Sequence, residues 1–450
     1  MQIIGVPSAP LFQTTAGMAS LAIFPAIVVF FHILITIAQS YTNISLGSSI
    51  STNGPDSPWK SPSGEFAFGF LAVPGAGGYL LSIWFDKLPD KTVVWSANRD
   101  SPAPPGSKIQ LFDDGRFELS DKRGRRIWAA GGIPSGAGVA YAAMLDTGNF
   151  VLARNDSTAA WQTFDSPTDT LLPAQALNRG DSLISRFSGE NYSRGRFTFI
   201  MQDDGNLVLY TRNFPLYDVV SAYWSTQTVG TGSRLVFNES GYIYLTGRDG
   251  AVIFFLASNP VPADRFYQRL TLQYDGVLRH YFRPKSGGSG WSVNVYFPSN
   301  ICLRILQSTG GGACGFNSLC SIGGDRNPNC ACPEGYSLVN PSDKLGDCKP
   351  DFAPQSCNNS KESELYGFVE MVDTDWPLSD YAHFDPVSEE WCRQECLVDC
   401  FCAVAIYRES NCWKKKFPLS NGRIDATVGG KALIKIRKIN GTRETMNPHR

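Results

Sequence analysis

The sequence has 450 residues, of which 43% are hydrophobic and 18% charged, and this balance excludes a disordered chain. The 43 Gly and 28 Pro residues favour many turns over long helices, so a mainly β fold is expected. Forty Lys and Arg residues oppose 41 Asp and Glu residues. The resulting net charge of -1 gives no large positive field, which argues against nucleic acid as a partner.

The N-terminal segment, residues 1–40, is predicted to be a signal peptide. Residues 21–37 are almost wholly apolar, and Ala38-Gln39-Ser40 offers small residues for cleavage before Tyr41. No Lys or Arg lies among the first 40 residues, so Met18 could be the effective start. An uncleaved signal anchor is the alternative. No later apolar run is long enough to span a membrane, so the mature chain is expected without a membrane span, secreted or at the extracellular face of the plasma membrane.

Glycosylation motifs of the form Asn-x-Ser/Thr are scattered along the chain after this leader. In an exported protein each such motif predicts an exposed, glycosylated loop or strand end. The predicted acceptors are Asn43, Asn155, Asn191, Asn238, Asn358 and Asn440.

Residues 41–300 are predicted to form short strands, because apolar and polar residues alternate between Gly, Asp, Asn and Pro turns. Leu111-Phe-Asp-Asp-Gly-Arg-Phe-Glu-Leu-Ser120 aligns with Met201-Gln-Asp-Asp-Gly-Asn-Leu-Val-Leu-Tyr210, and related turns recur at Gly148, Gly241 and Gly276. Gly205, Gly241 and Gly276 are 36 and 35 residues apart. Repeats this short cannot bury a sheet alone, so two groups of them predict two tandem domains, each with a shared core.

All 12 cysteines lie between Cys302 and Cys412. In an exported chain this even, dense set predicts six disulfides, three in each half of the region, although six cysteines allow 15 pairings. Cys392 and Cys396 are four residues apart in a predicted helix, which places both on one face. The alternative is a zinc site made by Cys392, Cys396, Cys400 and Cys402.

Two segments carry a family resemblance: Val93-Val-Trp-Ser-Ala-Asn-Arg-Asp-Ser-Pro102 and Trp161-Gln-Thr-Phe-Asp-Ser-Pro-Thr-Asp-Thr-Leu-Leu-Pro173. They closely resemble segments of the plant G-type lectin S-domain receptor-like serine/threonine kinases, and the C-terminal third is most similar to the grass lectin receptor kinases. The resemblance implies bulb-type lectin β-prism domains at 41–165 and 166–290, an EGF-like module at 298–350, a PAN/apple module at 351–437 and a tail at 438–450. Gly287-Gly-Ser-Gly290 is expected to be the junction between the lectin and cysteine-rich parts.

The same resemblance implies the disulfide pairing. The implied pairs are Cys302 with Cys320, Cys314 with Cys330, Cys332 with Cys348, Cys392 with Cys412, Cys396 with Cys402, and Cys357 with Cys400.

The candidate carbohydrate site is Gln202-Asp-Asp-Gly-Asn-Leu-Val-Leu-Tyr210, which matches Q-x-D-x-N-x-V-x-Y at every specified position. Alternate strand residues share a face, so Gln202, Asp204, Asn206, Val208 and Tyr210 are expected on one side. A carboxylate and two amides can bind vicinal hydroxyls, and Val208 would contact ring carbons. The resemblance to bulb lectins implies mannose. The alternative is purely structural, because Asp204-Gly205 also predicts a hairpin turn.

Equivalent positions elsewhere are degenerate. The first domain keeps only the Asp, and Asp146-Thr-Gly-Asn149 is interpreted as having an extra residue. The third repeat keeps Gln273, Asp275 and Tyr281 but has Val277 and Arg279 in place of the Asn and Val. In the first domain, the positions that correspond to the five residues of the candidate site are Phe112, Asp114, Arg116, Glu118 and Ser120.

No catalytic or metal-binding motif is found. The four histidines have no metal-ligand spacing, and the chain has no phosphate-binding loop, His-Arg-Asp or Asp-Phe-Gly segment, so no enzyme, cofactor or metal is expected. The segment before Cys302 lacks the acidic pattern of calcium-binding EGF-like modules. Lys414-Lys-Lys416 is interpreted as a solvated turn, and Trp95, Trp128, Trp161 and Trp224 as core aromatics rather than sugar-stacking residues.

The preferred hypothesis is an extracellular recognition domain that binds a mannose-type glycan, without the transmembrane and kinase parts of full family members. Its EGF-like and PAN modules would support a receptor homodimer or co-receptor pairing. The alternative is a peptide- or protein-binding S-domain receptor, or a soluble decoy, that has lost sugar binding. The chain could equally be a truncated product or a fragment of a kinase.

Overall fold

The computed structural model describes residues 43–438 except 55–56, 74–76, 134–137, 213–217, 289, 306–309 and 359. The predicted leader at 1–40, the acceptor Asn440 and nearly all of the tail lie outside these residues. Of the other predicted acceptors, Asn43, Asn155, Asn191 and Asn358 are exposed and Asn238 is half-buried. Within the described part, no helix is long and apolar enough to cross a membrane.

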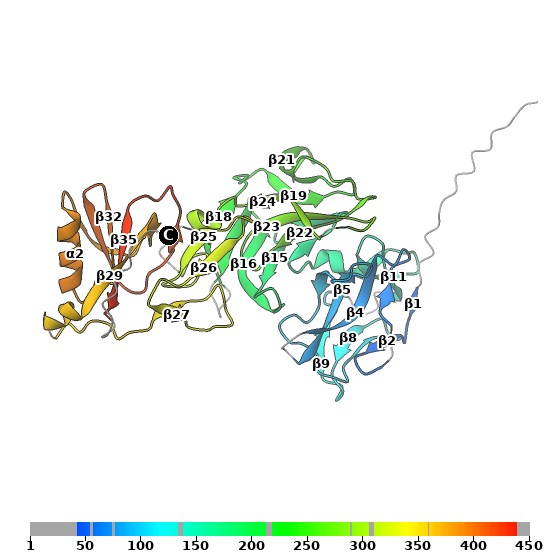
Figure 1. Ribbon diagram of the computed structural model, residues 1–450. Helices are drawn as coiled ribbons and strands as arrows, with labels where there is room; N and C mark the ends of the chain where they lie inside the picture. The colour runs from blue at the N-terminus through cyan, green and yellow to red at the C-terminus, as the bar shows by residue number, and fades with distance from the viewer. Residues whose placement is uncertain are drawn as a thin grey trace, which may run out of the picture. The chain divides into compact units, whose positions relative to one another are not determined.

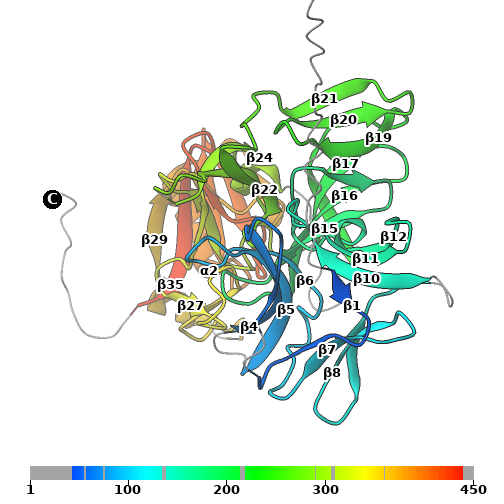
Figure 2. The same cartoon turned by 90° about the vertical axis from the view of Figure 1, so that its right-hand side faces the viewer.

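The first lectin-like unit consists of three antiparallel four-stranded sheets (Figure 1). One has the order β1 (Ile44–Ser45), β10 (Val139–Met144), β11 (Phe150–Arg154) and β12 (Ala159–Gln162), and these strands lie side by side in Figure 2. The second has β2 (Ser49–Ser51), β7 (Lys108–Leu111), β8 (Phe117–Ser120) and β9 (Arg126–Ala129). The third has β3 (Trp59–Lys60), β4 (Phe66–Val73), β5 (Gly78–Phe85) and β6 (Val93–Ser96). The N-terminal segment thus supplies an edge strand to every sheet.

A shared aromatic core joins the three sheets. Phe68, Phe117 and Phe150 come from β4, β8 and β11, and each is 1% exposed or less. The ring centroids of Phe68 and Phe150 are 4.2 Å apart, and those of Phe117 and Phe150 are 5.4 Å apart. Because each sheet gives one ring to the centre, no sheet buries its apolar face alone, as the short repeat predicts.

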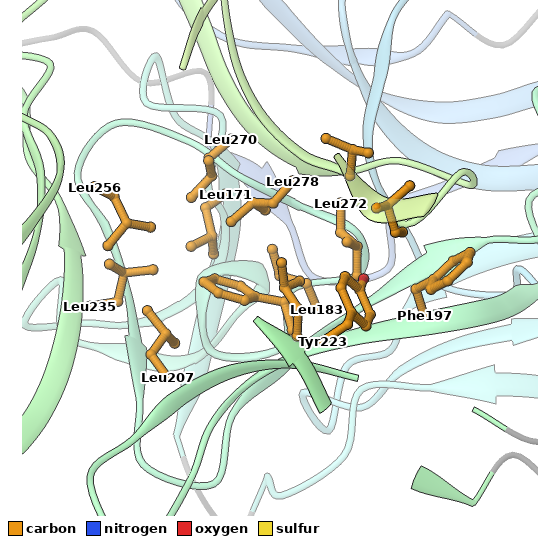
Figure 3. Packing of buried hydrophobic residues seen from close by; sticks show 14 of the residues in the cluster. Leu171, Leu183, Phe197, Leu207, Tyr223, Leu235, Leu256, Leu270, Leu272 and Leu278 are labelled. Carbon is orange, nitrogen blue, oxygen red and sulfur yellow. The ribbon is translucent and has the colours of Figure 1, made fainter. Parts of the chain in front are cut away.

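The second lectin-like unit repeats this arrangement after the short helix η1 (Thr163–Asp165). Its first sheet has β13 (Thr170–Leu171), β22 (Phe266–Leu272), β23 (Leu278–Pro284) and β24 (Ser292–Phe297). Its second has β14 (Gln175–Asn178), β19 (Gly232–Phe237), β20 (Ile243–Gly247) and β21 (Val252–Ala257). Its third has β15 (Ser182–Arg186), β16 (Arg194–Met201), β17 (Leu207–Arg212) and β18 (Val219–Ser225). Leucines from all three sheets meet in its core, including Leu171, Leu207 and Leu235 (Figure 3).

The second unit extends beyond the predicted boundary at residue 290. β24 pairs with β23, with Leu278 opposite Phe297 and Phe282 opposite Ser292. The prediction that Gly287–Gly290 is a junction between domains is therefore wrong, because the strands before and after it, β23 and β24, pair within one sheet. A glycine-rich turn and a glycine-rich linker have the same composition, so composition alone cannot separate them.

The cysteine-rich region starts with α1 (Ile301–Arg304) and contains three sheets. A four-stranded sheet has the order β26 (Pro328–Ala331), β25 (Leu319–Ile322), β34 (Arg423–Ile424) and β30 (Thr374–Asp375), and a small hairpin has β27 (Tyr336–Leu338) and β28 (Cys348–Pro350). After η2 (Ser360–Leu365), a five-stranded sheet has β29 (Tyr366–Val372), β35 (Lys431–Arg437), β32 (Val404–Arg408), β33 (Asn411–Lys415) and β31 (Asp380–Phe384). The first sheet combines strands from both predicted cysteine-rich modules, residues 298–350 and 351–437. The parallel pairing of β25 with β34 joins them.

Six disulfides link the twelve cysteines, and they are the pairs that the family resemblance implies. The bonds are Cys302–Cys320, Cys314–Cys330, Cys332–Cys348, Cys357–Cys400, Cys392–Cys412 and Cys396–Cys402. The Cα atoms of each pair are 5.2 to 5.7 Å apart, as disulfide geometry requires. The four cysteines of the zinc alternative are thus divided among three disulfides, and the described residues contain no cluster able to hold a metal ion.

Helix α2 (Glu389–Val398) packs on the five-stranded sheet (Figure 1). Its Cys392 and Cys396 are fully buried in one cluster with Ala405 and Leu433 of the sheet, so the prediction that both cysteines share a helix face is confirmed. The Ser388 hydroxyl caps the helix by accepting a hydrogen bond from the Trp391 backbone N–H at 3.2 Å.

The interpretation of Lys414–Lys416 as a solvated turn is wrong. Lys414 and Lys415 belong to β33 and are 6% and 1% exposed. The Lys415 ammonium pairs with Asp375 at 3.0 Å and with Asp380 at 2.5 Å, and these carboxylates compensate its burial. The run of three lysines does not predict this pairing, because the acidic partners lie more than 30 residues away in the sequence.

Candidate carbohydrate-binding site

The candidate site lies in the hairpin that joins β16 to β17, and a tight turn shapes it. Gly205 N–H donates to the Gln202 carbonyl at 3.0 Å, and Gln202 N–H donates to the Asn206 carbonyl at 2.9 Å. Gly205 has φ of 90°, and a Cβ there would lie 2.5 Å from the Gly232 carbonyl oxygen. Only glycine fits this position, because the φ and the close backbone approach both exclude a side chain.

The predicted alternation along this hairpin is present. Leu207 and Leu209 are fully buried in the core, whereas Asp204 is exposed and Asn206 half-buried. On the outer side the Gln202 side-chain amide donates to the Tyr210 hydroxyl at 3.0 Å. The inner residues therefore anchor the strand while the outer polar groups are held in a fixed arrangement.

Asp204 and Asn206 are oriented by neighbouring backbone and hydroxyl groups. One Asp204 carboxylate oxygen accepts the Asn206 backbone N–H at 2.8 Å. The Asn206 side-chain carbonyl accepts the Thr228 backbone N–H at 3.2 Å and the Thr226 hydroxyl at 3.3 Å. Asp204 Oδ2 and Asn206 Nδ2 have no recorded hydrogen bond to the described residues. An acceptor and a donor are thus left for vicinal hydroxyls of a ligand.

Val208 does not offer the predicted contact to a sugar ring, because its side chain is only 2% exposed. Val208 belongs to β17, which lies between β16 and β18 in the sheet. Its partners on these two strands are Ile200 and Ser225. Flanking strands cover a short branched side chain at such a position. Of the five predicted positions, only those with polar side chains are therefore accessible.

The equivalent hairpin of the first unit carries an ion pair in place of open polar groups. The Arg116 guanidinium contacts Asp114 at 2.7 Å and Glu118 at 3.2 Å, and it lies 4.7 Å from the centroid of the Phe112 ring. Hydrogen bonding to Arg116 lowers the pKa of the Asp114 carboxyl. The carboxylate that would accept a sugar hydroxyl is occupied.

The hairpin of residues 273–281 shows the same framework with its carboxylate closed. The Gln273 amide donates to the Tyr281 hydroxyl at 3.0 Å, just as Gln202 does to Tyr210. The Asp275 carboxylate, however, pairs with Arg279 at 2.9 Å, and the two side chains are 9% and 5% exposed. Arg279 also donates to the Asn327 side chain at 2.6 Å. The Asp275 carboxylate is thus engaged within the protein, and the structural role of this hairpin stays a prediction.

The sequence patterns do not predict the residues that hold Asn206. Asn149 in the first unit uses its side-chain carbonyl in the same way, accepting the Thr163 hydroxyl at 3.1 Å and the Phe164 N–H at 3.2 Å. The interpretation of an extra residue at Asp146–Asn149 is thus wrong, because Asn149 and Asn206 both follow the turn glycine directly. The shared Trp-x-Thr at Trp161–Thr163 and Trp224–Thr226 is the signal that could have found the supporting threonines.

Three sheets around a common core form each unit, and a lectin family model matches part of the chain. Residues 92–188 match the family described as D-mannose binding lectin, a match that does not include the hairpin of Gln202–Tyr210. Among solved structures, the mannose-specific agglutinin of snowdrop (Galanthus nivalis) bulbs, complexed with methyl-α-D-mannoside, is 23% identical, with a TM-score of 0.20. The likeness covers 28% of this chain and 94% of the agglutinin.

The chain is homologous to the G-type lectin S-receptor-like serine/threonine-protein kinases. It is 42% identical over 420 residues to LECRK3 of Oryza sativa subsp. indica, covering 89% of this chain and 51% of that protein. It is 43% identical over 432 residues to LECRK1 of the same subspecies, covering 90% of this chain and 52% of that protein. The chain therefore spans about half the length of these curated relatives, and no kinase domain is evident in its mainly β described part.

Proposed function

We propose that the chain is the extracellular recognition domain of a receptor-like kinase and that its second lectin-like unit binds a mannose-type glycan through Gln202, Asp204, Asn206 and Tyr210. Homology to the lectin receptor kinases and the six disulfides support an extracellular location. The cysteine groups at 298–350 and 351–437 are assigned to EGF-like and PAN modules. The exposed predicted acceptors are assigned as glycosylated.

The observation that carries the sugar site is the pair of open groups on Asp204 and Asn206. Of the three hairpins with this Asp, only that of Asp204 lacks a recorded arginine partner within the described residues. A carboxylate acceptor next to an amide donor fits two neighbouring hydroxyls of a pyranose. Binding uses side chains alone and needs no calcium.

The second candidate is a peptide- or protein-binding receptor, or a decoy, in which this hairpin has lost sugar binding. The burial of Val208 favours it, because the hairpin then lacks an apolar surface for ring carbons. The two candidates differ in whether mannose oligosaccharides bind at all.

Calorimetric titration with mannotriose separates these candidates. Asp204→Ala removes an acceptor that no neighbour replaces and is expected to weaken binding by about 1 kcal/mol or more, roughly fivefold or more. Asp114→Ala is the matched control and should leave affinity unchanged, because that carboxylate is occupied by Arg116. EDTA should have no effect. Absence of heat with the parent protein would contradict sugar binding, and a loss with Asp114→Ala would place the site in the first unit.

A further inference from the structure

A cavity of about 460 Å³ lies between residues of the two lectin-like units. This volume is within the roughly 300–1,000 Å³ range of small-molecule sites. The first unit contributes a tryptophan wall, and the second contributes Ser182 and Ile184 of β15. The connecting residues Ser166–Thr168 complete the lining. None of the five residues of the predicted mannose site lines this cavity.

The wall of the cavity is a cluster of three tryptophans, one from each sheet of the first unit. Trp95, Trp128 and Trp161 lie in β6, β9 and β12, with ring centroids 5.9 to 6.3 Å apart in edge-to-face contacts. Trp95 is only 6% exposed, and its indole N–H donates to the Ser166 carbonyl at 2.8 Å. Trp128 and Trp161 are half-buried, and no hydrogen bond to the described residues is recorded for their indole nitrogens. The prediction that these tryptophans are core aromatics therefore holds fully for Trp95 and only in part for Trp128 and Trp161.

Arg99 of the first unit links the two sides of the cavity by hydrogen bonds to the second unit. Its guanidinium donates to the backbone carbonyls of Ile184 at 2.9 Å, Ser185 at 2.7 Å and Tyr192 at 2.9 Å. Burial lowers the pKa of this guanidinium. At the rim, Arg194 pairs with Asp100 at 2.6 Å, with both side chains partly exposed. These charges are used within the protein, so the cavity presents little net charge to a ligand.

Three residues with side-chain hydroxyls also line the cavity. Ser166 is exposed, Thr168 and Ser182 are half-buried, and all three line the cavity. Their side-chain hydroxyls have no recorded partner among the described residues. A cavity lined by aromatic rings together with uncommitted hydroxyls and indole N–H groups suits a ligand with one apolar face and a polar edge. A neutral pyranose has this character, because its C–H groups lie on a face and its hydroxyls at the edge.

We propose that this cavity is a second saccharide site, which takes a short neutral oligosaccharide with a pyranose ring against Trp128 and Trp161 and its hydroxyls toward Thr168 and Ser182. The site is independent of the Asp204 hairpin and goes beyond the mannose site proposed above. The chain would then have two sugar sites of different construction.

Gly131 allows the cavity to be blocked without disturbing the fold. It lines the cavity, has no positive φ, and a Cβ built on it meets no atom within 4 Å. Gly131→Phe should therefore fill the cavity and leave the melting temperature unchanged. Gly324→Phe is the matched control, since Gly324 also has open space around its Cβ but lies outside the cavity.

The test is a fluorescence titration with mannotriose, cellotriose, maltotriose and xylotriose, because Trp128 and Trp161 report contact with a ring. At least one trisaccharide is expected to change the emission saturably in the parent, in Gly324→Phe and in Asp204→Ala alike. Gly131→Phe should weaken that response at least tenfold, and Thr168→Val, which removes only a hydroxyl, should weaken it severalfold.

Three outcomes would overturn the proposal. One is the absence of a saturable response to any of the four sugars. A response to an aromatic peptide in place of the sugars would count as this outcome. Another is equal affinity of the parent and Gly131→Phe. The third is a response lost with Asp204→Ala and kept with Gly131→Phe, which would assign the sugar to the mannose site alone.

Discussion

The hairpins of residues 202–210 and 273–281 share a backbone and differ in charge. Both have a turn glycine with positive φ and a Gln-to-Tyr hydrogen bond of 3.0 Å. In one, Asp204 is exposed with an oxygen left open; in the other, Asp275 is buried against Arg279. One arginine at the position of Val208 thus turns a ligand-ready carboxylate into part of the protein's own packing. The comparison shows that two outer positions differ, with Val277 and Arg279 in place of Asn206 and Val208, and that the arginine is the one that engages the carboxylate.

The largest expected difference between the hairpins is in the effect of removing the aspartate on stability. Asp275→Ala leaves the nearly buried Arg279 without its carboxylate and is expected to lower the free energy of unfolding by about 3–5 kcal/mol. Asp204→Ala at the exposed position should cost about 1 kcal/mol or less, through the lost contact to the Asn206 N–H. Urea denaturation of both variants measures this. Equal losses would refute the distinction.

A buried histidine gives the third-repeat hairpin a pH dependence that the other lacks. His280 occupies the place of Leu209 and is fully buried, and this burial lowers its pKa from 6.5 to about 4. Asn294 donates to its Nδ1 at 3.2 Å, so its Nε2 proton is donated to the Gln268 carbonyl oxygen at 3.0 Å. The fold therefore favours the neutral ring.

This favourable contribution is fully present above pH 6.5 and is lost as the pH falls toward 4, because the unfolded chain binds the proton first. The expected loss is about 3 kcal/mol between pH 7 and pH 4. Unfolding measured across this range should show a shallower decline for His280→Leu than for the parent. Parallel curves would contradict the assigned role of His280.

The smallest expected effect is on the contact that the hairpins share. Gln202→Ala and Gln273→Ala each remove a hydrogen bond to a tyrosine hydroxyl of the same length, so each should cost about 1 kcal/mol of stability. Only Gln202→Ala should also weaken mannotriose binding. A weaker affinity with Gln273→Ala would show that the third repeat takes part in binding.

The sequence predicts well what is local in the chain. Alternation and the Asp-Asp-Gly turn place Leu207 inward and Asp204 outward, and the family resemblance implies the disulfide pairs that the structure contains. The sequence predicts less of what depends on distant partners. The burial of Val208 results from flanking strands, and the partners of Lys415 are 40 and 35 residues away.

Other features follow from pairings that composition does not encode. The sheet shared by the two cysteine groups rests on the pairing of Cys320 with Arg423. The role of β24 follows from its register with β23, across a segment that has the composition of a linker. Pairing between segments far apart in sequence depends on the packing of the whole unit, which short patterns do not specify.

The most direct test of the central claim places the arginine of the third repeat in the second-unit hairpin. Val208→Arg puts a guanidinium where Arg279 lies relative to Asp275, so it should pair with Asp204 and abolish mannotriose binding in a calorimetric titration. Val208→Ala is the control and should bind nearly as the parent does, because Val208 is buried and gives the sugar no surface. Near-ultraviolet circular dichroism checks that both variants are folded. Unchanged binding by a folded Val208→Arg variant would contradict the claim that an open Asp204 carboxylate makes this hairpin the site.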